Sequence, residues 1–167
     1  HVRPAAEDVR EGDTIFVGGE VITPPVTGML ASLGVDPVPV VRRPRVAVIS
    51  TGDEIVDVDD EMEDGKIVDS NGYALSALVM DTGAEVVRLG ICPDTQEALE
   101  QKLREGISFD VIITSGGVSV GEYDFVKLAL DALGTTMEFW KVAMTPGRPL
   151  AFGMIQDTLA FGLPGNP

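Results

Sequence analysis

The segment Thr114–Asp124 reads TSGGVSVGEYD and follows the apolar, β-branched run Val111–Ile113. Such a run is typical of a buried parallel strand, and the pattern predicts that a helix begins where this segment ends. A chain that passes from a strand through glycines into a helix presents backbone N–H groups and the positive helix end to an anion. Side chains at Gly116, Gly117 and Gly121 would keep a phosphate or oxyanion away from that backbone. The residues also fit an ordinary strand-to-helix turn, and both interpretations stay open here.

Strands and helices alternate on both sides of this segment. The apolar periodicity predicts strands and helices in the order Val46–Ser50, Tyr73–Asp81, Glu85–Cys92, Thr95–Glu105, Val111–Ser115 and Phe125–Leu133. Strands are then expected at 137–144, 151–155 and 158–162, the last two joined as a hairpin by Gln156 and Asp157. This alternation predicts an α/β fold with a three-layer, mostly parallel sheet, helices on both faces and right-handed crossovers.

Residues 1–43 lack the alternation. A short strand is expected at Thr14–Val17 and a helix at Pro24–Leu33, with Thr23 before it and proline at its first position. We expect residues 1–43 to be the C-terminal part of a preceding linker or small domain, and residues 44–167 to be the α/β domain. The chain stops within the turn Leu163–Pro167, so a truncated domain is expected.

Composition excludes several classes of function. The 12 basic and 27 acidic residues give a net charge of −15, so no basic stripe can neutralise nucleic acid phosphates. Cys92 is the only cysteine, which excludes an internal disulfide and indicates a small buried hydrophobe. No apolar run approaches the ~18 residues that a membrane span needs. We therefore expect a cytoplasmic protein with neither nucleic acid nor membrane as a partner.

Ligands of parallel sheets bind beyond the carboxyl ends of the strands. That rule predicts that the segments 51–54, 93–94, 115–124 and 145–149 meet at one rim. The rim is rich in acids, namely Asp53, Glu54, Asp69, Asp94 and Asp124. Carboxylates beside phosphate are typical of a divalent cation such as Mg²⁺, which bridges protein and phosphate oxygens.

Each acid also has a purely local interpretation. Asp69 fits an N-cap of the helix that follows it, and Asp94 with Glu97 fits a capping box. Asp124 fits the first turn of its helix. The candidate cations are Lys141, in an apolar strand, and Arg148, in a rigid Pro-Gly-Arg-Pro turn, although either could pair with a surface acid.

Five ordered motifs resemble one known family. They are TGDE (Thr51–Glu54), DSN (Asp69–Asn71), SGGVSVGEYD (Ser115–Asp124), PGRP (Pro146–Pro149) and LPGNP (Leu163–Pro167). Together they resemble the molybdopterin molybdotransferases, the molybdenum insertases that include the gephyrin E domain. The resemblance runs from about Val2 to Pro167. It implies the fold of molybdenum cofactor biosynthesis domains and a homodimer in the full-length protein.

The resemblance also implies a reaction and its residues. Adenylylated molybdopterin and molybdate would give molybdenum cofactor and AMP, with a divalent cation, Mg²⁺ or another. Glu54, Asp94 and Asp124 would hold the metal and act in catalysis together with Lys141, while Arg148 and Lys141 would hold molybdate. The substrate-binding residues implied by the motifs are Thr51, Gly52, Asp53, Ser70, Asn71, Ser115, Gly116, Gly117, Ser119, Gly121, Pro146, Gly147, Arg148, Pro164 and Pro167.

Two positions depart from the family pattern. Thr145 stands where the family usually has lysine or arginine, and Gly72 stands where it often has arginine. The family site is completed by segments N-terminal to this region, so we expect this chain alone to retain the binding rim and little turnover. A molybdopterin adenylyltransferase and a non-catalytic, pterin-binding or scaffold module remain the alternative functions.

Overall fold

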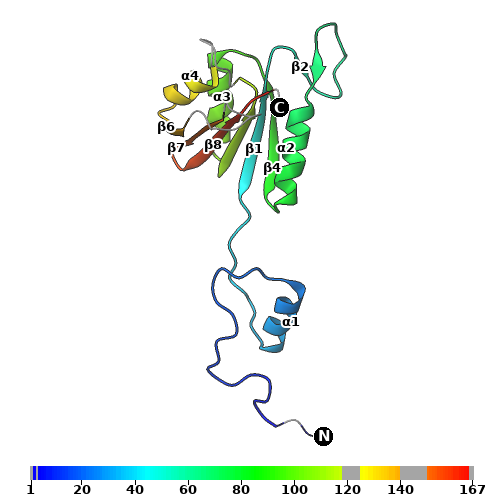
Figure 1. Ribbon diagram of the computed structural model, residues 1–167, viewed down its shortest axis with the longest axis vertical. Helices are drawn as coiled ribbons and strands as arrows, with labels where there is room; N and C mark the ends of the chain where they lie inside the picture. Colours follow the sequence, from blue (N-terminus) through cyan, green and yellow to red (C-terminus); the bar gives the residue numbers. More distant parts are fainter. Residues whose placement is uncertain (1, 3, 118–124, 140–149, 166–167) are drawn as a thin grey trace. The chain divides into compact units, whose positions relative to one another are not determined.

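The computed structural model describes residues 2, 4–117, 125–139 and 150–165 (Figure 1). The chain divides into two compact units, His1–Val41 and Arg42–Pro167, which are described separately. The second unit contains every strand found in the described residues.

The larger unit is built on a six-stranded sheet with the order β4-β1-β5-β8-β7-β6. Strands β4, β1, β5 and β8 are mutually parallel, whereas β7 is antiparallel to both of its neighbours. The strands comprise Glu85–Cys92 (β4), Arg45–Thr51 (β1), Val111–Ser115 (β5), Thr158–Leu163 (β8), Ala151–Ile155 (β7) and Thr136–Phe139 (β6). The predicted mostly parallel α/β sheet is confirmed.

Helices cover both faces of this sheet. Figure 1 shows α2 (Ser70–Asp81) on one side and α3 (Gln96–Gly106) with α4 (Phe125–Ala132) on the other. Six residues of β1 are buried in succession, which is expected for a central strand with helices on both faces. The main core lies between the sheet and the α3–α4 layer, where Leu99 and Leu103 meet Ile49 and Ile112.

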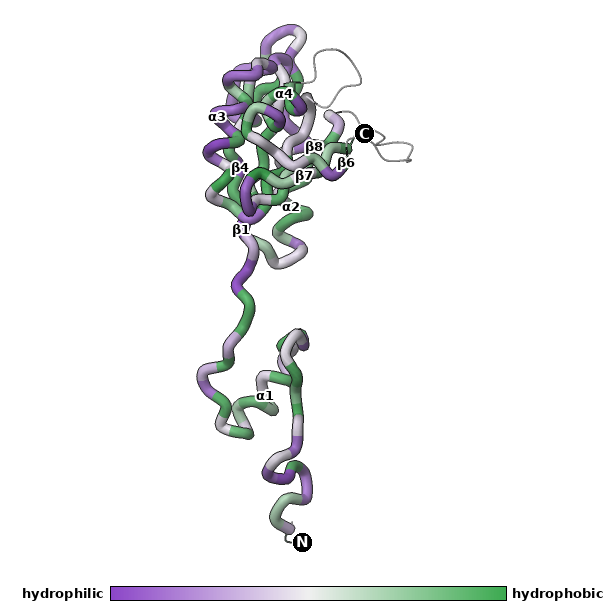
Figure 2. The backbone as a smooth tube through the Cα atoms, turned by 90° about the vertical axis from the view of Figure 1, so that its left-hand side faces the viewer, coloured by the Kyte–Doolittle hydropathy of each residue, from purple (hydrophilic) through white to green (hydrophobic). Residues whose placement is uncertain are grey.

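The hydropathy of the chain follows these layers. In Figure 2, β4 is hydrophobic along most of its length, whereas α3 is largely hydrophilic. Only one face of α3 is buried, through Leu99, Leu103 and Gly106, so its remaining surface can stay polar. Across the described residues, no helix combines the length and the apolar composition needed to cross a bilayer.

A small second sheet interrupts the alternation after β1. Strands β2 (Ile55–Val56) and β3 (Ile67–Val68) are parallel and enclose an acidic loop. The Ile67 N–H donates to the Glu54 carbonyl at 2.9 Å, and the Asp69 N–H donates to the Val56 carbonyl at 2.9 Å. These bonds bring the chain back to the start of α2 next to the end of β1. The sequence did not predict this sheet, because two-residue strands carry no periodic signal.

Two helix starts differ from their predictions. Helix α2 begins at Ser70, three residues early, because the Asp69 carboxylate accepts the Gly72 N–H at 2.8 Å and caps the first turn. The capping box at Asp94 is wrong: Thr95 is the N-cap of α3, and its hydroxyl accepts the Ala98 N–H at 3.3 Å. The Asp94 N–H instead donates to the Asp53 carboxylate at 3.2 Å, which turns Asp94 toward the loop after β1.

The chain end forms the predicted hairpin between β7 and β8. Ile155 and Thr158 pair across the turn, and Gln156 adopts a positive φ of 55°. The strand expected at 137–144 is observed as Thr136–Phe139, and residues 140–149 lie outside the described part of the chain.

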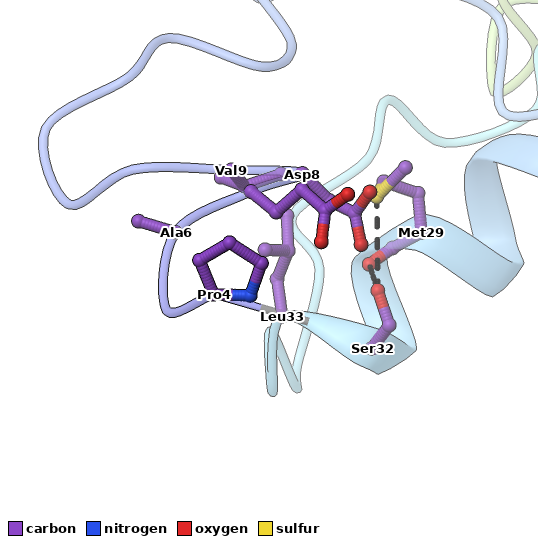
Figure 3. A pocket seen from close by; sticks show the side chains of 8 residues that line it. Pro4, Ala6, Asp8, Val9, Met29, Ser32 and Leu33 are labelled. Atoms are coloured by element: carbon purple, nitrogen blue, oxygen red, sulfur yellow. Dashed lines mark hydrogen bonds between the residues drawn. The ribbon is translucent and has the colours of Figure 1, made fainter. Parts of the chain in front are cut away.

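The smaller unit contains one helix, α1 (Pro24–Ser32), with Thr23 at its N-cap. The strand predicted at Thr14–Val17 is wrong, since described residues of this unit form no strand that could pair with it. No residue of α1 is buried. A pocket of about 620 Å³ lies between α1 and the preceding loop, and Figure 3 shows it from close by. Its lining consists of Pro4, Ala6, Glu7, Asp8, Val9, Met29, Ser32 and Leu33.

The core predicts a strong effect of truncating Leu103, which is fully buried. Leu103→Ala should lower the free energy of unfolding by about 2–5 kcal/mol, because a cavity opens between α3 and the sheet. Urea unfolding measures the change. Leu78→Ala is the matched control on α2: this side chain is 62% exposed, and its loss should change stability by about 0.5 kcal/mol or less. Equal effects of the two substitutions would contradict the assigned core.

Candidate functional site

The carboxyl ends of three parallel strands lie next to one another. Ser50 pairs with Ser115, and Ser115 pairs with Leu163, so β1, β5 and β8 end at the same level of the sheet. On the other side of β1, Thr51 pairs with Cys92 at the end of β4. The loops that follow these strands therefore start from one rim.

The glycine turn after β5 is packed against the end of β1. Gly116 and Gly117 have positive φ values of 92° and 67°. A Cβ atom on Gly116 would overlap the carbonyl oxygen of Thr51, and one on Gly117 would lie 2.9 Å from the Thr51 hydroxyl oxygen. The Gly116 N–H donates to the Leu163 carbonyl at 3.0 Å. Both glycines are thus required by close packing, and the amide of Gly116 is already bonded within the protein.

The DSN segment is anchored through the carboxylate of Asp69, which is 2% exposed. It accepts the Ser50 hydroxyl at 2.8 Å in addition to the Gly72 N–H. A Cβ atom on Gly72 would overlap this carboxylate and lie 2.7 Å from the Ser50 hydroxyl oxygen. The close approach of cap and helix explains why glycine occupies position 72 in this chain.

Asn71 joins the DSN segment to the turn near the chain end. Its side-chain N–H donates to the carbonyl oxygen of Gly165 at 2.7 Å. A Cβ on Gly165 would lie 3.3 Å from the Cα of Gly116, so this turn also touches the glycine turn after β5. Three motifs that are far apart in the sequence are thereby in contact.

These three motifs surround a pocket of about 150 Å³. Its lining consists of Asn71, Ala74, Leu75, Ser115, Leu163, Pro164 and Gly165. The walls combine apolar side chains from α2 and β8 with the Ser115 hydroxyl and the Asn71 amide, a mixture typical of small-molecule sites. Pockets that enclose a whole drug-sized ligand measure roughly 300–1,000 Å³, so this one has room for part of a larger ligand.

An acidic group lies after β1 and β4. Burial, followed by the nearby charges of Asp53 and Glu54, raises the pKa of the Asp94 carboxyl above its ordinary value. Lys66 reaches the same loop, where its ammonium donates to the Asp53 carbonyl oxygen at 2.7 Å. A site that concentrates carboxylates against their own repulsion has the chemistry of a cation-binding site.

The described residues contain no group of three or more His, Cys, Asp or Glu side chains arranged to hold a metal ion. Of the three predicted metal ligands, Glu54 and Asp94 lie among the described residues. The third, Asp124, lies outside the described residues, as do Ser119, Gly121, Lys141, Pro146, Gly147, Arg148 and Pro167.

The remaining predicted residues fall into two neighbouring groups. Gly52, Asp53, Glu54 and Asp94 belong to the acidic loops, and Asn71, Ser115 and Pro164 line the small pocket. Thr51 is buried between these two groups. Its hydroxyl donates to the Ser115 carbonyl oxygen at 3.5 Å. Ser70, the first residue of α2, is exposed.

Sequence reasoning missed several residues around the site. Ala74 and Leu75 lie three and four positions after Asn71, which puts all three on one face of a helix, and this spacing was an available signal. Arg88 is a charged residue inside an apolar strand, which is a second such signal. Ser50 carried none, because its role depends on a contact with Asp69 that only the fold creates.

Cys92 is fully buried, as predicted. Burial is the main cause that raises the pKa of its thiol to about 11. The thiolate that a nucleophile or metal ligand requires is therefore scarce at neutral pH.

Comparison with known proteins gives a consistent result. A family described as "Probable molybdopterin binding domain" matches residues 47–167. The molybdopterin molybdenumtransferase of Haemophilus influenzae is 42% identical over 168 residues, covering 100% of this chain and 41% of the relative. That of Bacillus subtilis is 39% identical over 168 residues, covering 100% and 39%. The crystal structure of a molybdopterin biosynthesis MoeA protein from Pyrococcus horikoshii has a TM-score of 0.77 and 35% identity, covering 89% of this chain and 37% of that one.

This chain thus spans about two fifths of the length of the curated relatives it matches.

The packing of the glycine turn predicts the effect of a single methyl group. Gly116→Ala should lower the free energy of unfolding by about 1–3 kcal/mol through overlap with the Thr51 carbonyl, in addition to about 1 kcal/mol of left-handed backbone strain. Gly134→Ala is the matched control, since Gly134 has a similar φ of 72° and open space where its Cβ would lie. Urea unfolding of both variants separates overlap from strain. Equal losses would contradict the contact between the glycine turn and β1.

The raised pKa of Asp94 predicts a stability change with a defined sign. The folded protein holds this proton more tightly than the unfolded chain, so the contribution of Asp94 becomes less favourable as pH rises above the ordinary aspartate value of about 3.9. Asp94→Asn should therefore be more stable than wild type at pH 7, with a smaller difference at pH 4.5. Thermal unfolding at both pH values measures it. Asp59→Asn, in the exposed acidic loop, should show no such trend, and a less stable Asp94→Asn at pH 7 would refute the assigned effect of burial and neighbouring charge.

Proposed function

Because the chain belongs to the molybdopterin-binding domain family, we propose that it binds adenylylated molybdopterin at the ends of β1, β5 and β8. In the proposed reaction, molybdate enters the dithiolene of the bound pterin and AMP is released. The chain would supply the binding core for this molybdotransferase reaction in molybdenum cofactor biosynthesis.

One observation carries the proposal. The DSN, SGG and LPG segments meet around one pocket, through the Asn71–Gly165 and Gly116–Leu163 hydrogen bonds. Three turns that are separated by tens of residues converge on a recess with apolar walls and two polar groups. Such convergence is what a site for a flat heterocycle with a polar edge requires.

The small pocket would take one ring of the substrate. Ala74 and Leu163 offer apolar contact to its faces, and the Ser115 hydroxyl offers a hydrogen bond to its edge. The phosphates would then extend along the rim toward the segment that follows Gly117, whose glycine-rich sequence between a strand and a helix favours an anion. Arg148 and Lys141 are the proposed partners of molybdate.

The acidic loops fit a divalent cation. Glu54 and Asp94 would hold it together with Asp124. Burial and the charges of Asp53 and Glu54 raise the pKa of Asp94, and a bound positive charge would offset both effects. When bound, such a cation neutralises the charge of the phosphoanhydride that is broken. Magnesium is the proposed ion.

The proposed reaction concerns the full length seen in relatives, of which this chain spans about two fifths. A homodimer would complete the site with other segments of the polypeptide, and the reaction would take place in the cytoplasm. Thr145, where the family usually has a basic residue, makes Lys141 and Arg148 the principal cations for the oxyanion.

The test uses purified protein of the full length seen in relatives, with adenylylated molybdopterin, Mg²⁺ and molybdate, and it follows AMP by chromatography. AMP release that requires molybdate is the expected result. Asp94→Asn should reduce the rate about 100-fold or more, since electrostatic partners of a reacting phosphate typically contribute that much. Asp59→Asn should keep the wild-type rate. Adenylylation of molybdopterin from ATP would instead favour an adenylyltransferase, and absence of any binding to AMP or molybdopterin would refute the proposal.

A further inference from the structure

Arg88 lies in the edge strand β4, on the same side of the sheet as α2. It pairs with Val48 directly before the register shift in β4, where Gly90 adopts a positive φ of 86°. Its guanidinium carbon is 3.7 Å from the centre of the Tyr73 ring. Its terminal nitrogen is 3.1 Å from the Asp57 carboxylate and 3.6 Å from that of Asp69. One arginine thus contacts α2, the cap of α2 and the loop between β2 and β3.

The contact with Asp69 is significant because that carboxylate is buried. A buried carboxylate is costly unless it is hydrogen-bonded and paired with a positive charge. Ser50 and Gly72 provide the hydrogen bonds. Among the described residues, Arg88 is the cation found within 4 Å of the Asp69 carboxylate.

A further hydrogen bond, between two partners of Arg88, helps to hold it in this position. The Tyr73 hydroxyl donates to the Asp57 carboxylate at 2.8 Å, and this bond is the main reason why the pKa of Asp57 is lowered. Tyr73 lies four residues after Asp69, so the two side chains share one side of the first turn of α2. The guanidinium thus contacts the Tyr73 ring and the carboxylates of Asp57 and Asp69.

The first turn of α2 also carries Asn71, which bonds the carbonyl oxygen of Gly165 and lines the small pocket. A shift of this turn would move the pocket wall. We propose that Arg88 is a positioning residue for the pocket: by pairing with Asp69 it fixes the first turn of α2 and so keeps Asn71 on the Gly165 turn. This role goes beyond the proposed function and rests on it only for the identity of the ligand.

Nuclear magnetic resonance of ¹⁵N-labelled protein tests the proposal without any ligand. In Arg88→Met, the Gly72 amide should exchange with solvent at least tenfold faster, and the side-chain amide signals of Asn71 should move toward those of a free asparagine. The amide of Ile112 in β5 should keep its protection, which shows that the sheet remains folded. Arg88→Lys keeps the positive charge. Its Gly72 amide should therefore exchange more slowly than in Arg88→Met, and its Asn71 side-chain signals should lie closer to those of wild type.

Arg45→Met is the matched control. Arg45 also stacks on an aromatic ring, with its guanidinium carbon 4.5 Å from the centre of Phe109, but it lies at the opposite end of β1. Its removal should leave the Gly72 and Asn71 signals unchanged. If Arg88→Met loses the Ile112 protection, Tyr73→Phe and Asp57→Asn replace it. Tyr73→Phe removes the hydrogen bond that orients Asp57, and Asp57→Asn removes the ion pair with Arg88.

A folded Arg88→Met with unchanged Gly72 and Asn71 signals would overturn the proposal. The same result in both replacement variants would also overturn it. Titration with AMP then separates the two proposals. If AMP shifts the Asn71 and Ser115 signals of wild type, Arg88→Met should weaken its binding about tenfold. If neither AMP nor molybdopterin shifts a signal in wild type, the proposed function fails, whereas the ligand-free measurements still decide the role of Arg88.

Discussion

The close approach of Gly116 to the neighbouring strand ends is the constraint on which the site depends. Its N–H is bonded to the Leu163 carbonyl, and its Cα has no room for a side chain beside the Thr51 carbonyl. Because β1, β5 and β8 are parallel and in register, this contact brings three strand ends together. The pocket beside Ser115 exists because the turn after β8 can lie directly against that glycine.

Charge is distributed around this contact in two different ways. At the ends of β1 and β4, burial and the nearby charges of Asp53 and Glu54 together raise the pKa of Asp94. Beside α2, the buried Asp69 is compensated by hydrogen bonds and by Arg88. The compensated carboxylate has a structural role, as a helix cap. The uncompensated group retains electrostatic energy that a bound cation could relieve, which is the usual property of a functional site.

The fold could be predicted from the sequence only in part. The βα alternation and the buried run of β1 predicted the layers, and Asp69 was correctly interpreted as a helix cap, because both depend on neighbours within a few residues. The capping box at Asp94 was wrong because a long-range bond to Asp53 competes with the local pattern. The strand at Thr14–Val17 was wrong because a strand needs a partner, and no described strand provides one.

The sequence alone determined the main strands and helices of the larger unit, and which end of the sheet would carry the motifs. Both follow from local hydrophobic periodicity and from the direction of parallel strands. Only the tertiary structure decided that Asn71 would hold Gly165, that Gly72 would have no room for a side chain, and that Arg88 would pair with Asp69. The two pairings join residues 94 and 19 positions apart, and the third feature depends on the space at a Cβ, so no periodic pattern records any of them.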